Sequence, residues 1–303
     1  MAFERDSLVE RLDTLGALVN DSSAPAPAAR RASVFAAATH SRAPQVPPAE
    51  PGTAAGLFVE VSDALDADLE TLDALDWSSV VLGGWSVQDT VVHLAAVHEV
   101  LATRLNGRDE RPIVAGELDE ATDRLIAEHC HVAPSETRRF WRASVDRLRH
   151  GLAICDTEFN WLGLDVRAET AIVDRSFETW IHANDIRRVT NRSSLDPSGQ
   201  HLFVMCNLAI DLLPLALIVT DRPHHALVTV NLSGPGGGTW TMPLGSGAAS
   251  GVEFTLNAAA RELCLLMGDR IDAADFAFTI RGDDTAMDIV RDLVDVAPSF
   301  ARR

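Results

Sequence analysis

A chain of 303 residues is long enough to form two domains of ordinary size, each with its own hydrophobic core. Hydrophobic residues make up 47% of it and charged residues 23%, the balance of a folded globular protein. The formal net charge of −18 argues against nonspecific binding to nucleic acid or to an anionic membrane surface. The four cysteines are spread widely and form no C-x-x-C pair, which disfavours a disulfide framework and a zinc ribbon: Cys130, Cys155, Cys206 and Cys264.

The first 53 residues are predicted to form a short helix followed by a linker. Apolar residues recur there at helical spacing: Leu8, Leu12, Leu15 and Val19. Residues 21–52 are rich in Ala, Pro and Ser, a composition typical of linkers, with a second short helix expected around 30–40. No apolar segment of a secretory signal opens the sequence, so we expect a cytoplasmic protein.

Four helices are predicted next, and four helices joined by loops form a bundle. They cover about residues 54–75, 87–105, 134 to beyond 148, and 168–189, with a loop at 156–167 before the last. Gly83 and Gly84 separate the first two helices, and Ser86 with Asp89 resembles a capping box at the start of the second. Pro134 suits the start of the third helix.

Beyond residue 195 the pattern becomes α/β. The apolar run 202–219 is interpreted as a buried helix, because Asn207, Asp211 and Pro214 disfavour a membrane span. Further segments read as strands at 226–232, 239–244, 252–256 and 276–281, and as helices at 258–267 and 285–294. The glycine run 234–238 predicts a hairpin turn, since neither a helix nor a Lys-Ser/Thr pair follows it as a phosphate loop requires.

A possible metal site comes from three residues on two of the helices. Glu178 and His182 are four residues apart, so both side chains project from one face of a helix. His93 can supply a third ligand from another helix, and two histidines with one carboxylate suit zinc or a similar divalent ion. The same residues also fit a plainer interpretation, in which the Glu-His pair lies on a solvated face and His93 is a packed histidine.

Two longer sequence strings favour the metal site. Gly84 to Leu94 reads G-W-S-V-x-D-x-x-x-H-L, and Phe177 to Arg187 reads F-E-T-W-I-H-x-x-D-I-R. Both resemble the metal-site signature of mycothiol-dependent maleylpyruvate isomerases, which belong to a larger DinB-like group of metal-binding four-helix bundles. The resemblance implies a divalent metal, zinc first, at His93, Glu178 and His182. It also implies mycothiol, a low-molecular-weight thiol, as cosubstrate, and a small electrophilic molecule as substrate.

The resemblance extends to other residues and to the C-terminal region. Residues 263–270 and 281–283 look like the sterol-carrier-like domain that accompanies the bundle in these isomerases. An arginine contacting an acidic substrate is expected there, and the sequence leaves three candidates: Arg270, Arg281 and Arg291. Asp185 could orient a ligand histidine as an acceptor behind the metal. Asp89 is interpreted as a helix cap and Trp85 and Trp180 as core aromatics. The cluster His129-Cys130-His131 is disfavoured as a metal site, because adjacent helical residues point in different directions.

The predicted fold class is therefore α + α/β, in three parts. Residues 1–53 form an N-terminal extension, 54–195 a DinB-like metal-binding bundle, and 196–303 a smaller sterol-carrier-like α/β domain. The main functional hypothesis is a metal-dependent, mycothiol-using transferase or isomerase. One alternative is a thiol-independent metal enzyme of specialised metabolism. Another is a regulatory protein with a vestigial site and a protein partner for its extension, because residues 30–38 resemble an extension of some actinobacterial anti-sigma-like relatives, without its cysteines.

Overall fold

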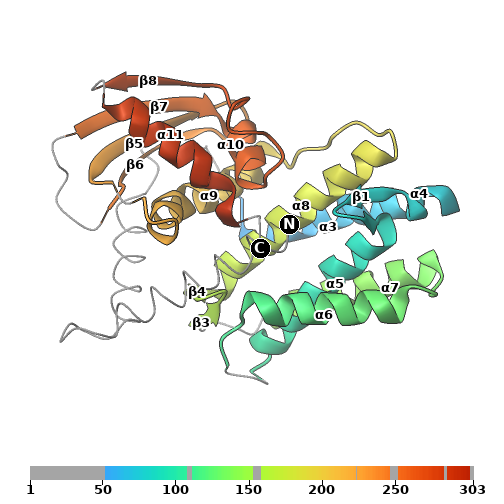
Figure 1. The fold of residues 1–303 in the computed structure, drawn as a ribbon. Coiled ribbons are helices and arrows are strands. Elements are labelled where there is room, and N and C mark those ends of the chain that lie inside the picture. Colours follow the sequence, from blue (N-terminus) through green and yellow to red (C-terminus); the bar gives the residue numbers. More distant parts are fainter. Residues whose placement is uncertain are drawn as a thin grey trace. The chain divides into compact units, whose positions relative to one another are not determined.

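The computed structural model describes residues 52–107, 111–152, 158–222, 224–245, 252–282 and 285–300. These residues divide into two compact units, one formed by Thr53–Pro197 and the other by the described residues from Ser198 onward together with Gly52. Both are drawn in Figure 1. The helix and linker predicted before residue 52 lie outside the described residues, as do Cys155 and Asp283.

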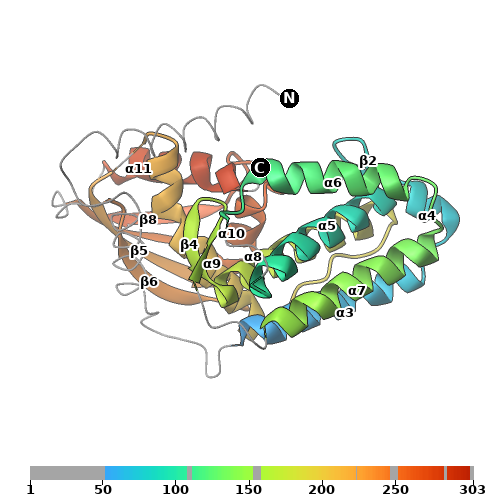
Figure 2. The same cartoon turned by 90° about the horizontal axis from the view of Figure 1, so that it is seen from below.

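The first unit is built on the four predicted helices (Figure 2). These are α3 (Ala54–Glu70), α5 (Val87–Leu105), α7 (Pro134–Leu152) and α8 (Ala168–Val189). Helix α5 packs against α7, and α3 packs against α8. Apolar side chains from all four fill the bundle core, with fully buried Leu57, Leu94, Leu148 and Ile172 among them. The mixed helical and sheet fold class predicted from the sequence is confirmed, and the second unit supplies the sheet.

The first helix is shorter than predicted. It ends at Glu70, and a separate short helix, α4 (Ala74–Ser78), follows. The reason is local: the Asp73 side chain accepts hydrogen bonds from the backbone N–H groups of Leu75 and Asp76, and Asp76 reciprocates in a capping box. A strong cap at Asp73 starts a new helix and so interrupts the periodicity that had suggested one continuous helix to residue 75.

Helix α6 and the hairpin before α8 were also not predicted. Helix α6 (Ala115–His129) packs along α5, yet only Ala121 and Thr122 of it are buried, which leaves little apolar periodicity to detect. The segment expected as a loop at 156–167 contains a β-hairpin of β3 (Glu158–Trp161) and β4 (Leu164–Arg167). Its two turn residues, Leu162 and Gly163, have φ angles of 53° and 85°, the positive values that a two-residue hairpin turn needs.

A second hairpin precedes α5. Strands β1 (Val80–Leu82) and β2 (Trp85–Ser86) pair antiparallel, and Gly83 and Gly84 form the turn with φ angles of 59° and 91°. Glycine adopts such angles without a steric penalty, which explains the chain break that the Gly-Gly pair predicted.

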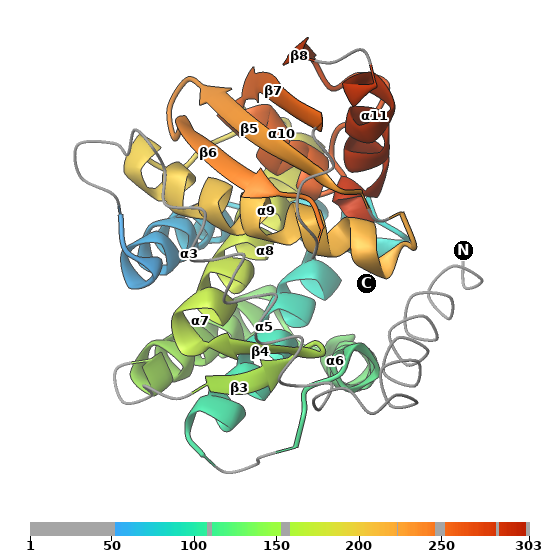
Figure 3. The same ribbon diagram turned by 90° about the vertical axis from the view of Figure 1, so that its left-hand side faces the viewer.

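The second unit contains a four-stranded sheet with three helices (Figure 3). The strand order is β6 (Gly238–Pro243), β5 (Ala226–Ser233), β7 (Val252–Ala259) and β8 (Phe278–Gly282). Strands β5 and β7 run parallel and the other pairs are antiparallel. The helices are α9 (Gly199–Val219), α10 (Ala260–Met267) and α11 (Ala286–Val296), and a 3-10 turn, η1 (Ala297–Phe300), ends the described chain.

Burial alternates along the central strands, so one face of the sheet carries the core. In β5, Ala226, Val228, Val230 and Leu232 are buried, whereas the residues between them are half-buried. The glycine run forms the predicted hairpin turn between β5 and β6. Helix α9 is long and apolar enough to cross a membrane, but 67% of its most apolar stretch is buried inside the structure, as in the core helix of a folded domain.

Candidate metal centre

The start of helix α5 is fixed by a capping box, which places His93 two turns into the helix. The Ser86 hydroxyl accepts a hydrogen bond from the backbone N–H of Asp89 at 3.1 Å. The Asp89 carboxylate accepts in return from the Ser86 backbone N–H at 2.9 Å and from its hydroxyl at 2.7 Å. Asp89 is therefore a cap residue, as predicted, and it orients the helix rather than the site.

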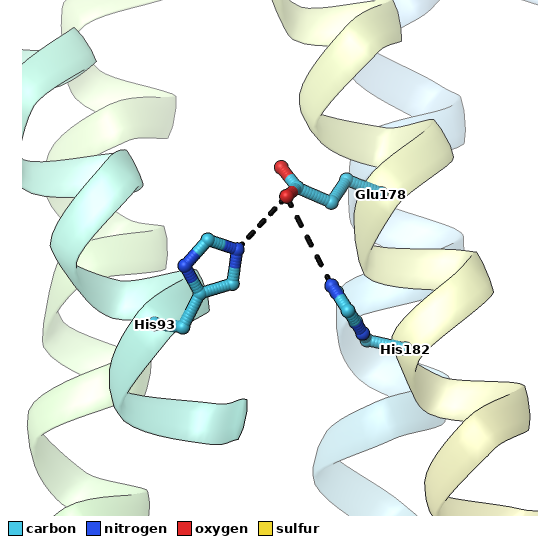
Figure 4. Close-up of side chains that lie close together, drawn as sticks. All are labelled: His93, Glu178 and His182. Atoms are coloured by element: carbon cyan, nitrogen blue, oxygen red, sulfur yellow. Dashed lines mark hydrogen bonds and ion pairs between the residues drawn. The ribbon is translucent and has the colours of Figure 1, made fainter. Parts of the chain in front are cut away.

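Three side chains from two helices converge inside the bundle (Figure 4). The Nε2 atom of His93 on α5 lies 2.9 Å from Oε1 of Glu178 on α8, and Nε2 of His182 lies 3.9 Å from the same oxygen. One ligand atom from each residue lies within 4.8 Å of the other two. Among the described residues, this is the group of His, Cys, Asp and Glu side chains that could hold a metal ion. His182 is buried and the other two residues are half-buried, so the group is reachable from solvent.

The far nitrogen of each histidine faces an oxygen. Nδ1 of His93 lies 3.1 Å from the hydroxyl of Thr122 on α6, within hydrogen-bond distance. Nδ1 of His182 lies 3.4 Å from Oδ2 of Asp185, which is the acceptor expected from the sequence. This second contact is close, but its angles leave Nδ1 of His182 buried without a hydrogen bond. A metal-binding histidine usually donates its second ring N–H to such an oxygen, which leaves the other nitrogen free to bind the ion.

The carboxylate of Glu178 is shared among three neighbours. Oε1 faces the two histidines, whereas Oε2 accepts a hydrogen bond from Nη1 of Arg175, one turn earlier on α8. Arg175 and Thr122 are residues that the sequence reasoning missed. The three-residue spacing from Glu178 could have revealed Arg175. Thr122 lies on the helix that was not predicted, and no sequence signal connects it to His93.

The two tryptophans of the sequence strings differ in burial, and a third histidine, His98, lies on α5 with His93. The ring of Trp85 lies against that of His93, with 4.9 Å between centroids. Trp85 is half-buried, so it borders the site and is not the plain core aromatic that was expected. Trp180 is buried as expected and donates its indole N–H to the Leu195 carbonyl at 2.9 Å. Burial lowers the pKa of the fully buried His98 to about 3, and the nearby charges of Arg175 and His93 act in the same direction.

Of the three arginine candidates, two have local partners and the third is exposed. Arg270 donates to the Gly268 carbonyl at 2.7 Å, the exposed Arg291 donates to Asp288 at 3.1 Å, and Arg281 is exposed on β8. All three belong to the second unit. At the end of α6, the ring of His129 contacts the Leu125 carbonyl at 2.8 Å, and Cys130 is exposed.

Comparison with known proteins places this bundle among characterised folds. Residues 58–187 match the family model described as the mycothiol maleylpyruvate isomerase N-terminal domain. The crystal structure of the mycothiol-dependent maleylpyruvate isomerase is similar, with a TM-score of 0.52 and 18% identity over 75% of this chain and 91% of that one. The crystal structure of a histidine-to-alanine mutant of the isomerase matches over the same shares, with a TM-score of 0.52 and 17% identity. At these identities the structural likeness establishes the fold. No curated protein sequence matches the chain.

Proposed function

We propose that this protein is a metal-dependent enzyme. The proposal starts from residues 58–187, which belong to the family of mycothiol maleylpyruvate isomerase N-terminal domains. In this proposal the protein uses mycothiol to isomerise a small electrophilic molecule or to conjugate it. The observation that carries the proposal is the convergence of His93, Glu178 and His182 on one point between α5 and α8.

The donor set fits a divalent first-row metal. Two neutral imidazole nitrogens and one carboxylate oxygen suit zinc, and three protein ligands leave a coordination position for a reacting group. The oxygens of Thr122 and Asp185 behind the two histidines support the same assignment, because they favour the ring orientation in which both Nε2 atoms face the centre.

If these three residues hold a divalent ion, the ion would lower the pKa of a coordinated thiol. A free cysteine-type thiol has a pKa of about 8.5 and is mostly protonated at neutral pH. The protein contributes position and charge. His93 and His182 come from different helices and so fix the point at which ligands meet, while the Glu178 carboxylate offsets positive charge. Trp85 lies beside His93, with 4.9 Å between the ring centroids, and so borders the site.

Metal analysis of purified protein tests the site directly. We expect about one divalent ion per chain, zinc foremost, in protein prepared without chelator. His93→Ala, Glu178→Ala and His182→Ala should each lose most of the metal. His150→Ala is a matched control, because His150 is exposed on α7, and it should retain full occupancy. Full occupancy in all three site variants would show that the site is wrongly assigned.

Thiol use is tested in cobalt-substituted protein. Adding mycothiol should produce an intense sulfur-to-metal charge-transfer band, and Glu178→Ala should show none. A flat titration with cobalt demonstrably bound would remove the mycothiol proposal. The thiol-independent metal enzyme would then be the function to test.

A further inference from the structure

The two oxygens of Glu178 have different partners, and these partners determine how many of the two oxygens can bind a metal. Oε1 lies 2.9 Å from Nε2 of His93 and 3.9 Å from Nε2 of His182. Oε2 is the acceptor for Nη1 of Arg175. A charge-assisted hydrogen bond from a guanidinium is about twice as strong as a neutral one, so Oε2 is firmly held.

Arg175 itself is fixed from three sides. Its Nη2 donates to Oδ2 of Asp174 at 2.9 Å, and its guanidinium carbon lies 5.3 Å from the ring centroid of Trp161, in cation–π range. The indole N–H of Trp161 donates to the same Asp174 oxygen at 3.0 Å. Trp161 is the last residue of strand β3, so the β3–β4 hairpin holds Arg175 in place. Arg175 is buried, and little room is left for it to adopt another conformation.

We infer that Arg175 is a positioning residue that restricts Glu178 to one metal-binding oxygen. This inference rests on the proposed metal site. A carboxylate with both oxygens free can bind an ion through both, and the second oxygen then occupies the position that a substrate thiol needs. The Arg175 guanidinium prevents this by engaging Oε2, and it thereby keeps the site open for mycothiol.

Removal of the guanidinium should therefore change metal and thiol binding in opposite directions. In Arg175→Gln, Oε2 is released, so the ion stays bound with at least wild-type affinity. Mycothiol binding should weaken by about tenfold or more, because the released Oε2 competes with the thiol for its coordination position. A merely structural role for Arg175 would weaken both affinities together, because a loosened bundle no longer brings α5 and α8 to one point.

Cobalt-substituted full-length protein provides both measurements. The visible ligand-field spectrum of cobalt depends on the number and kind of its ligands, and the charge-transfer band measures mycothiol affinity. We expect a changed ligand-field spectrum and weaker mycothiol binding in Arg175→Gln, with one cobalt per chain retained. Arg175→Lys should change in the same direction by a smaller amount. Its ammonium group keeps a charged donor for Oε2, but it lacks the planar set of N–H groups with which the guanidinium holds Asp174 and Glu178 together. Circular dichroism shows whether each variant is folded, and either folded variant is enough to test the role of Arg175.

Arg187→Lys is the matched control, since Arg187 lies on the same helix α8 as Arg175 and pairs with Asp68 of α3 without touching Glu178. It should have the wild-type spectrum and mycothiol affinity. A wild-type spectrum and affinity in the Arg175 variants would overturn the inference, and so would equal changes in Arg187→Lys. If wild-type protein binds no cobalt, the proposed metal site itself fails. If it binds cobalt but not mycothiol, the ligand-field comparison alone still decides the role of Arg175.

Discussion

Asp68 joins the ends of two bundle helices, and its replacement by asparagine should destabilise the bundle measurably. The carboxylate is buried near the end of α3. Arg187, in the last turn of α8, donates to it through Nε at 2.6 Å and Nη2 at 2.9 Å, and Arg192 donates through Nη1 at 3.1 Å. Asp68→Asn keeps the volume of the side chain but turns an NH₂ group toward two guanidinium groups.

The magnitude follows from burial. Removing one partner of a fully buried ion pair costs about 3–5 kcal/mol, whereas an exposed pair contributes about 0–1 kcal/mol. The side chains of Arg187 and Arg192 are 18% and 27% exposed, so water can solvate them partly once the carboxylate is gone. We therefore expect a loss of about 2 kcal/mol in the free energy of unfolding, between those limits.

Urea denaturation followed by tryptophan fluorescence measures this loss in the bundle. Five of the six tryptophans lie in the unit formed by residues 53–197: Trp77, Trp85, Trp141, Trp161 and Trp180. A loss of about 2 kcal/mol should lower the urea midpoint by roughly 1 M, given slopes of about 1–3 kcal/mol per molar. Glu70→Gln is the control on the same helix, because Glu70 is 67% exposed and 3.6 Å from Arg138. If the midpoint of Asp68→Asn falls no further than that of Glu70→Gln, the three-residue network adds no net stability and the reasoning fails.

Two further predictions concern helix α5. His98 has its pKa lowered to about 3 against 6.5 in the unfolded chain, so below pH 6.5 the unfolded state takes up a proton that the folded state does not. The free energy of unfolding of the wild type should therefore fall by up to about 1.4 kcal/mol per pH unit, relative to that of His98→Leu, as the pH decreases from 6.5 toward 3. Urea titrations at pH 4–6 measure both free energies, and equal slopes of free energy against pH would contradict the prediction. Ser86→Ala removes the hydroxyl of the capping box with Asp89 and should cost about 1 kcal/mol, seen as a lower melting temperature. Ser79→Ala, which removes an exposed hydroxyl bonded to the carbonyl of Leu75, should change it far less.

The parts of this molecule that were predictable from sequence depend on short-range rules. The bundle helices follow from apolar residues at helical spacing, and the start of α5 follows from Ser86 and Asp89 three residues apart. The pairing of Glu178 with His182 on one face of α8 follows from the pitch of the helix. The spacing of residues along the chain did not predict that His93 approaches Glu178 and His182. This approach was anticipated because the strings around His93 resemble a known metal-site signature.

Other features were decided by tertiary packing. Helix α6 packs along α5 with little apolar periodicity of its own, and it alone brings Thr122 to Nδ1 of His93. The β3–β4 hairpin places Trp161 over Arg175, fourteen residues later in the chain, and this clamp determines which oxygen of Glu178 remains available. Local sequence specifies which face of a helix a side chain occupies, because that depends on neighbours within one turn. The partners it meets from other elements depend on how those elements pack, and so the outer contacts of the site appear only in the folded chain.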